Sequence, residues 1–320
     1  MIAEGERTVD AAELERQLAC ARAAAAGSAV GLYGPGSMKW QVDREAALFL
    51  GAGRALLLQL AHPWVAAAVA QHSGALIDPI GRFHRTFRTV YAMVFGTLEQ
   101  AVAAARQLHR RHGAIEGALP WAAGPFPQGS AYRANDLAAL KWVHATLTDT
   151  AVTAHGLILA PLSPEARERY YAEGRRFAGC FGIPAEALPG TWGGFAAYVE
   201  AMHASPVLTV TPTARDIAHQ LLAGAGNPLV IPGWYRALTA GLLPPPLREG
   251  FALSYGLAEE KAVERALGWL RRVYPMLPAR LRYVGPYHEA MDRLSGRPRA
   301  GTRTQLLNRL WIGQRFLGSG

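Results

Sequence analysis

The sequence is poor in cysteine and in lysine. Its two cysteines, Cys20 and Cys180, lie 160 positions apart in a chain of 320 residues. This number excludes a disulfide scaffold, an iron–sulfur cluster on four thiolates and a zinc site of the CxxC type, and it favours a reducing compartment. Lysine occurs at three positions, so 30 of the 33 basic residues are arginine.

Signatures of several common protein classes are also missing. The chain has no Gly-rich dinucleotide fingerprint, Walker lysine, GxSxG elbow or HExxH pair. Its formal net charge is +9, but the arginines are scattered and basic runs do not exceed two or three residues. Nucleic-acid binders concentrate basic residues on one face or interleave them with stacking aromatics. We therefore expect no nucleic-acid partner.

Two segments bear on localisation. The first 18 residues carry acids where an export signal needs a basic and then an apolar run, so they predict no export signal. Residues 55–77 lack Asp, Glu, Lys and Arg and are long enough to span a bilayer. They also contain histidine, glutamine and proline, which are costly in hydrocarbon. We interpret them as a helix buried in protein, and expect a soluble, cytoplasmic chain without a membrane span.

The hydrophobic spacing is helical over nearly the whole chain. Polar N-cap residues, several followed by proline, predict where helices begin. The expected N-caps are Asp43, Asp78 (before Pro79), Thr97, Asn135 or Asp136, and Ser163 (before Pro164). The expected helices cover residues 10–26, 43–60, 79–95, 97–113, 135–159, a segment from 163, 191–204, 213–223, 232–241, 245–255, 258–274 and 302–317.

Signals for strands and for repeats are weak. Residues 207–213 (VLTVTPT) form the best strand candidate, although their proline weakens it. No repeat of 30–50 residues is present, which argues against a solenoid. The longest linker-like stretch, residues 119–130, is too short to separate independent domains. The sequence predicts an all-α fold, with one globular multi-helix domain over residues 1–320.

Ten histidines mark most of the candidate chemistry. His62 and His72 are polar residues in an otherwise apolar helical stretch, so they must find partners when buried. They fit either hydrogen bonding at a helix kink or the lining of a pocket. His144, near Trp142 on a predicted core helix, has the same two interpretations.

A second cluster combines arginine with a hydroxyl. Arg82 and Thr86 lie four residues apart and so share one helix face, with Arg85 beside them. If this face turns inward, its guanidinium groups need an anionic partner, such as the carboxylate of a cofactor. If it turns outward, it is an ordinary solvated patch.

A third cluster contains His109 and His112. Their spacing of three residues would let them share one metal ion, but HxxH is a weak signal without further ligands nearby. A single imidazole at the end of a helix, facing an apolar pocket, also suits haem iron as its proximal ligand. The residue types alone leave both interpretations open.

Four ordered blocks carry a resemblance to a known family. They are GRALLLQLAHPWVAAAVAQHS (53–73), DPIGRFHRTFRTVYAMVFG (78–96), HGAIEG (112–117) and LKWVHATL (140–147). Together they resemble the catalytic domain shared by bacterial latex-clearing proteins, the rubber oxygenases, and the fungal MpaB oxygenase. The resemblance covers about residues 30–225 and leaves helices of residues 226–320 to pack on that part. It implies an all-helical, globin-like core that holds haem b and cleaves an isoprenoid double bond with dioxygen.

The resemblance also implies roles for single residues. The family's proximal histidine, in its H-x-x-[IV]-x-G block, falls on His112, with His109 as the alternative. Its distal R-x-x-K-T motif falls on Arg82, Arg85 and Thr86, with arginine in place of the lysine. Arginine is not deprotonated in proteins, so a distal bond from lysine to iron is unavailable here. Arg85 and Thr86 could instead hydrogen-bond bound dioxygen.

The remaining cofactor contacts follow from the same resemblance. Arg82 or Arg54 would pair with the haem propionates, which suits guanidinium geometry. His62 and His144 would lie in the pocket or directly behind it. A void of the size of a flat ligand is expected beside His112.

The predicted function is therefore a haem b-dependent oxygenase that uses O2 on a small apolar substrate, such as an isoprenoid or another alkene. One alternative is a haem-free helical protein that binds an apolar carboxylic acid through Arg82 and Arg85. Another is a non-haem metalloenzyme that uses His109, His112 and Glu116. The sequence does not determine the oligomeric state.

Overall fold

The computed structural model describes residues 7–72, 78–224, 230–297 and 300–318, and most of these residues are helical. The α-helices of the first half are α1 (Ala11–Ala23), α2 (Met38–Asp43), α3 (Ala52–Leu60), α4 (Pro63–His72), α5 (Pro79–Phe95), α6 (Leu98–Gly113) and α7 (Leu137–Ile158). Those of the second half are α8 (Pro164–Gly179), α9 (Trp192–His203), α10 (Pro212–Leu222), α11 (Gly233–Gly241), α12 (Pro245–Gly250), α13 (Leu257–Val273), α14 (Ala279–Arg282), α15 (Gly285–Leu294) and α16 (Thr302–Ile312). Three short 3-10 helices are η1 (Ala46–Gly51), η2 (Ala185–Ala187) and η3 (Tyr274–Met276). The predicted all-α fold class is confirmed.

Most of the predicted helix starts are confirmed, together with the side chains that cap them. The capping residues are Asp10 for α1, Asp78 for α5, Thr97 for α6, Asp136 for α7 and Ser163 for α8. Thr97 forms a full capping box with Gln100. Caps are local interactions between a side chain and backbone N–H groups two or three residues away, so they are readable in a sequence.

The expected helix over residues 43–60 is wrong in its start and in its continuity. Asp43 does not cap a helix: it is the last residue of α2, which Ser37 caps. The Asp43 carboxylate instead pairs with Lys39, one turn earlier in α2, and accepts a hydrogen bond from Tyr170, 127 positions away, as described below. The chain then passes through η1 before α3 begins at Ala52.

The prediction of a strand at residues 207–213 is also wrong. This segment is irregular until Thr211 caps α10, whose first residue is Pro212. The strands that form are β1 (Glu116–Ala118) and β2 (Ala131–Arg133), an antiparallel pair joined by the stretch 119–130. Strands of three residues are too short for a period of two to be recognised.

Two further differences concern the second half. The expected helix over 245–255 ends early, since α12 stops at Gly250 and Ala252 has a φ of 53°. Helices α14 and α15, over residues 279–294, were not expected. Both begin next to a proline, Pro278 or Pro286, without a polar side chain as cap.

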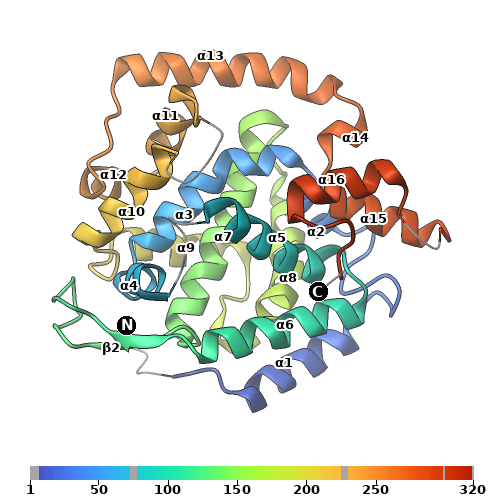
Figure 1. Ribbon diagram of the computed structural model, residues 1–320, viewed down its shortest axis with the longest axis horizontal. Coiled ribbons are helices and arrows are strands. Elements are labelled where there is room, and N and C mark those ends of the chain that lie inside the picture. Colours follow the sequence, from blue (N-terminus) through green and yellow to red (C-terminus); the bar gives the residue numbers. More distant parts are fainter. Residues whose placement is uncertain (1–6, 73–77, 225–229, 298–299, 319–320) are drawn as a thin grey trace.

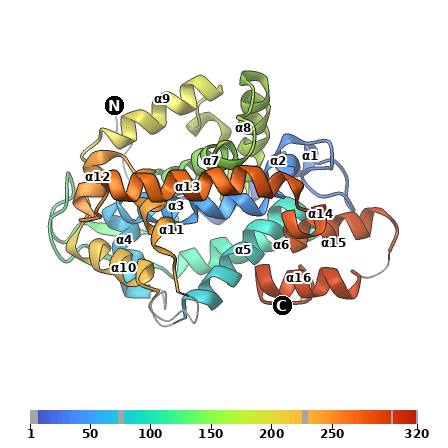
Figure 2. The same cartoon turned by 90° about the horizontal axis from the view of Figure 1, so that it is seen from above.

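Helix α7 runs through the middle of the molecule and contacts α2, α3, α8, α9 and α13. Helices α5 and α6 lie in front of it in Figure 1, with α1 below α6. Helices α8 and α9 cover the opposite side, as the view from above in Figure 2 shows. The later helices pack on this centre: α11 contacts α3, α13 contacts α7, and both α15 and α16 contact α5.

Two buried tryptophans join helices to each other through their indole N–H groups. Trp40 of α2 donates to the carbonyl oxygen of Val94 in α5 at 2.7 Å. Trp142 of α7 donates to that of Leu58 in α3 at 2.9 Å. Both side chains are almost fully buried, and each belongs to one of the two largest hydrophobic clusters. Each indole therefore contributes apolar burial and also satisfies its polar atom.

The apolar stretch 55–77 divides into the last part of α3, the helix α4 and residues outside the described part. Pro63 separates the two helices as the first residue of α4. None of the described helices is both long and apolar enough to cross a bilayer.

Candidate functional site

His112 lies in the last turn of α6, on the face that the helix turns toward the protein. Positions 101, 105, 108 and 112 recur at spacings of four, three and four residues, so His112 continues the stripe of Ala101, Ala105 and Leu108. Burial, and then the neighbouring His109, lowers the pKa of His112 to about 4, while a hydrogen bond with Asn135 acts in the opposite direction. The imidazole is thus neutral near pH 7, the form that binds a metal ion.

His109 is held by the backbone of the N-terminal segment. Its Nε2 lies 3.0 Å from the carbonyl oxygen of Val9, and because a carbonyl can only accept, Nε2 carries the proton. The side-chain amide of Asn135 donates to the carbonyl oxygen of His109 at 3.2 Å. The ring of His109 is thus bound to the backbone, whereas the ring of His112 has a side-chain partner, Asn135.

A small cavity lies beside these histidines. It has no enclosed space for a water molecule, since its empty space of about 160 Å³ includes open solvent, and it is lined by Leu108, His109, His112, Asn135, Leu140, Cys180 and Phe181. Sites for small organic ligands are usually about 300–1,000 Å³ in volume, and a haem needs a space of that class. The expectation of a void the size of a flat ligand beside His112 is therefore not met by the described residues.

The predicted motif residues of α5, Arg82, Arg85 and Thr86, differ in their exposure to solvent. Arg82 is largely buried, and its Nη1 has no hydrogen-bond partner within the described part of the chain. Burial, and then the charge of Arg85, lowers the pKa of the Arg82 guanidinium from its ordinary value. Arg85 and Thr86 are exposed, and Arg85 forms an ion pair with Asp78 at 3.0 Å. This buried Nη1 atom, which has no partner among the described residues, is the feature of α5 that points to an anionic ligand.

Arg54 is buried in a different place and its hydrogen bonds are made within the protein. Its Nη2 donates to Asp149 at 2.6 Å, its Nη1 to the hydroxyl of Thr150 at 2.7 Å, and its Nε to the carbonyl oxygen of Leu242 at 3.0 Å. The positive charge of Arg54 is thereby balanced by Asp149. Of the two arginines proposed for haem propionates, Arg82 has the free donor.

His62 lies at the junction of α3 and α4 among aromatic rings. Its ring centroid is 5.8 Å from that of Trp64 and 5.6 Å from that of Phe126, which comes from the loop between β1 and β2. Burial lowers the pKa of His62 to about 4. His62 Nδ1 and Trp64 Nε1 are both buried without a hydrogen-bond partner among the described residues. The cluster therefore has unused hydrogen-bonding capacity, while His72 is exposed and contacts the carbonyl oxygen of Glu116.

His144 lies on the inner face of α7, next to α8. Its Nε2 donates to the carbonyl oxygen of Gly174 at 3.2 Å, and its Nδ1 is buried without a partner in the described structure. Burial lowers the pKa of His144 to about 4, and the charge of Lys39 acts in the same direction, against the hydrogen bond to Gly174. His144 is thus a neutral core histidine in contact with a backbone carbonyl.

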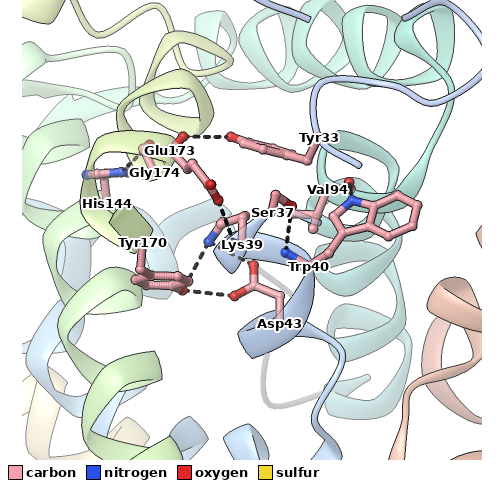
Figure 3. Close-up of polar contacts among 10 residues, drawn as sticks. All are labelled: Tyr33, Ser37, Lys39, Trp40, Asp43, Val94, His144, Tyr170, Glu173 and Gly174. Carbon is pink, nitrogen blue, oxygen red and sulfur yellow. Dashed lines mark hydrogen bonds and ion pairs between the residues drawn. The ribbon is translucent and has the colours of Figure 1, made fainter. Parts of the chain in front are cut away.

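A buried polar network that the sequence analysis missed lies beside His144 (Figure 3). Lys39 forms an ion pair with Asp43 at 2.7 Å and donates to the hydroxyl of Tyr170 at 3.1 Å. That hydroxyl donates to the other oxygen of Asp43 at 2.8 Å, and the carboxylate of Glu173 accepts from the backbone N–H of Lys39 at 2.7 Å. The spacing of four residues between Lys39 and Asp43 could have signalled a pair on one helix face. The network joins α2 to α8.

The predicted site residues are not linked directly to His112 in the described structure. No hydrogen bond or ion pair in the described part of the chain joins His112 to Arg82, Arg54, His62 or His144. The described residues also contain no group of three or more His, Cys, Asp or Glu that could hold a metal ion. Glu116, in β1, is exposed and faces Arg133 at 3.7 Å. The alternative of a metal site on His109, His112 and Glu116 is therefore wrong for this structure.

Comparison with known families identifies the family of the chain. A family model for the catalytic domain of the ER-bound oxygenase mpaB/B′ and rubber oxygenase matches residues 40–272, which are 233 of the 320 residues. The chain belongs to this family. The match to the mpaB/rubber oxygenase family extends beyond the resemblance seen in the sequence and includes α11, α12 and nearly all of α13. Comparisons with curated proteins and with solved structures give no significant match.

Membership of the mpaB/rubber oxygenase family supports an oxygenase, and hence an oxidoreductase, as the general type of activity. The matched segment contains α5 and α6 and therefore both Arg82 and His112. Helices α15 and α16 follow the matched segment in the sequence, and both pack against α5.

Proposed function

We propose that this chain is a haem b-dependent oxygenase that uses dioxygen on a small apolar substrate, with His112 as the axial ligand of the iron. The observation that carries the proposal is the family match over residues 40–272 together with the state of His112. A neutral imidazole in the last turn of a helix, with its neighbour His109 held by the backbone, is a donor suited to haem iron.

The charged and polar residues fit the rest of such a group. Arg82 supplies the buried, unpartnered guanidinium that a propionate would satisfy. Arg54 is proposed as a structural residue, because Asp149 already balances its charge. Arg85 and Thr86, which follow Arg82 on α5, are the proposed donors to an oxygen ligand, and they would have to turn inward to act.

The space beside His112 fits a haem group less well than the donor side chains do. The hollow beside His112 has no enclosed space for a macrocycle, so Asn135 and Phe181, which line it, would have to move for the ligand to enter. When bound, haem would supply the chemistry that activates dioxygen, which amino-acid side chains cannot provide. The protein's own part would be to hold the ligand histidine neutral and to exclude water with the apolar side chains of α6 and α7.

The remaining assignments are part of the same proposal. His62 and His144 are proposed to lie behind the pocket, where each is neutral and buried. An isoprenoid or another alkene is the proposed substrate class, since the family includes rubber oxygenase. We propose a cytoplasmic location on the basis of the low cysteine content, which is typical of a reducing compartment.

The test is an absorption spectrum of the full chain purified from cells supplied with haem. We expect a Soret band, haem b in the pyridine haemochrome assay, and a loss of at least tenfold in haem content for His112→Ala. The matched control is His109→Ala, one turn away on the same helix, which should retain haem. Full haem content in folded His112→Ala would overturn the ligand assignment.

One observation keeps a second candidate function in view. The free Nη1 of Arg82 would suit the carboxylate of an apolar acid as well as a propionate. Colourless, iron-free protein that binds dodecanoate, and loses this binding in Arg82→Gln, would establish the haem-free binding protein instead. The same two measurements therefore separate the two functions.

A further inference from the structure

The outward face of α13 combines basic and apolar side chains in an unusual way. Lys261, Arg265, Trp269, Arg272 and Met276 follow each other at spacings of four, four, three and four residues, so they form one stripe that continues from α13 into η3. All five are exposed, Trp269 by 61% and Met276 by 82%. The opposite face of the helix is buried through Val263 and Leu267, on the side that packs against α11. We call these five residues the α13 stripe.

The surface next to the α13 stripe also combines exposed basic and apolar side chains. Leu281 of α14 is 62% exposed, and Arg280 beside it is exposed as well. Residues 265–288 contain no aspartate or glutamate. Arg282 is not counted here because its charge is balanced by Glu45 at 2.8 Å. Arg272 and Arg280 therefore lack acidic neighbours in the sequence, whereas Arg265 directly follows Glu264.

The acids of α13 lie away from Trp269. Glu260 and Glu264 are exposed and share a second stripe with Arg271, whose Nε donates to the carbonyl oxygen of Leu157. Five residues make about 1.4 turns, so Glu264 lies about 140° around the helix from Trp269. Glu264 is three residues from Lys261 and therefore flanks the first residue of the α13 stripe. From Arg265 to Met276 no acid lies three or four residues from a member of the stripe, so this part presents positive charge alone.

The position of α13 makes this surface accessible. The helix runs along the upper edge of the molecule in Figure 1 and across the front in the view from above in Figure 2. With 17 residues it is about 25 Å long. No other described helix lies outside it in either view.

We propose that the α13 stripe docks this protein on the surface of an anionic lipid bilayer. Tryptophan, methionine and leucine would enter the interfacial region, while the arginines and Lys261 contact lipid phosphates. This partner explains both halves of the stripe: the apolar residues gain a medium less polar than water, and the cations gain counter-charges. The proposal goes beyond the proposed oxygenase function and does not require it.

Two other partners explain the stripe less well. A second copy of this chain would place the arginines of one stripe against those of the other across a symmetric interface, which is unfavourable. A nucleic acid would satisfy the arginines, but it offers nothing for exposed Met276 and Leu281. A lipid surface is the partner that the observations favour.

The test is flotation of the full chain with vesicles of phosphatidylglycerol and phosphatidylcholine in equal parts, compared with phosphatidylcholine alone. We expect binding to the anionic vesicles that weakens with salt and falls about fivefold for each arginine removed in Arg265→Gln and Arg272→Gln. Trp269→Ser and Met276→Ser together should weaken it at least tenfold. Lipids brominated in the acyl chain should quench the protein's fluorescence, and less so in Trp269→Phe.

The chain offers matched controls on other faces. Trp121, in the loop between β1 and β2, is 54% exposed, and Trp121→Ser should bind vesicles as the parent chain does. Arg303→Gln with Arg309→Gln on α16 removes two exposed arginines and should also leave binding unchanged. Three results would each overturn the proposal: no binding to anionic vesicles, equal loss in these controls, or a dimer in ultracentrifugation that Trp269→Ser dissociates.

Discussion

The guanidinium of Arg54 in α3 donates to the carboxylate of Asp149 in α7 at 2.6 Å, and the Arg54 side chain is only 7% exposed. This ion pair ties the central helix to its neighbour inside the protein. Removing one partner of such a pair leaves the other charge without compensation. The contact therefore predicts a role for Arg54 in stability.

We expect Arg54→Ala to lower the free energy of unfolding by about 3 kcal/mol, measured by urea denaturation. The control is Arg106→Ala, which breaks a pair with Glu15 whose two side chains are 41% and 48% exposed. That change should cost less than about 1 kcal/mol, because exposed ion pairs contribute little. Equal costs for the two variants would contradict the structural role of Arg54.

The stability of the protein should fall as the pH is lowered from about 6.5 to about 4. His62, His112 and His144 each have a pKa of about 4 in the folded chain because they are buried, against an ordinary value of 6.5. Within this range the unfolded chain binds a proton at each position and the folded chain does not, so acid favours unfolding. Each histidine should contribute a slope on the order of 1 kcal/mol per pH unit.

The measurement is the urea midpoint near neutral pH and at about pH 5. His144→Gln keeps a donor for the carbonyl of Gly174 but cannot titrate, so the difference between the two midpoints should shrink by roughly a third. An unchanged difference in His144→Gln would show that this residue does not contribute.

Gly31 should not tolerate a side chain. Its φ is +98°, and a Cβ atom there would collide with the carbonyl oxygen of Gly96 at the turn between α5 and α6. We expect Gly31→Ala to lower the free energy of unfolding by at least about 2 kcal/mol, from backbone strain and from the displaced turn. Gly36→Ala, where a Cβ meets nothing within 4 Å, is the control and should change stability by less than about 1 kcal/mol.

The hydroxyl of Tyr170 completes the pairing of Lys39 with Asp43. In Tyr170→Phe each charged group loses one hydrogen bond inside the protein. We expect a loss of about 2 kcal/mol in the free energy of unfolding, measured by thermal or urea denaturation. Tyr255→Phe, at a half-exposed position, serves as control. A loss no larger than that of the control would mean that water replaces the missing hydroxyl.

Helix starts were the most predictable part of the fold, and long-range pairing the least. Asp78 and Thr97 cap helices through backbone groups three residues away, so their sequence context was enough. Asp43 has the same residue type but is used by Lys39 and Tyr170, the latter 127 positions away. The β1–β2 hairpin was missed for a related reason, since three-residue strands owe their pairing to the surrounding packing.

For the candidate site, too, some properties could be predicted from the sequence and others could not. The family could be inferred from four ordered blocks, and the family match over residues 40–272 confirms it. The burial and free donor of Arg82, the exposure of Arg85 and the balanced charge of Arg54 could not be inferred. All three are arginines on helices, and only their surroundings distinguish them.

By itself, the order of residues determined the helical class, most helix starts and the family, because periodicity and caps act over a few neighbours and motifs are read directly. The tertiary structure decided which charges are balanced, which imidazoles stay neutral and how small the cavity beside His112 is. These properties depend on groups brought together from distant positions, and burial, which no local pattern specifies, sets the energy of each charge.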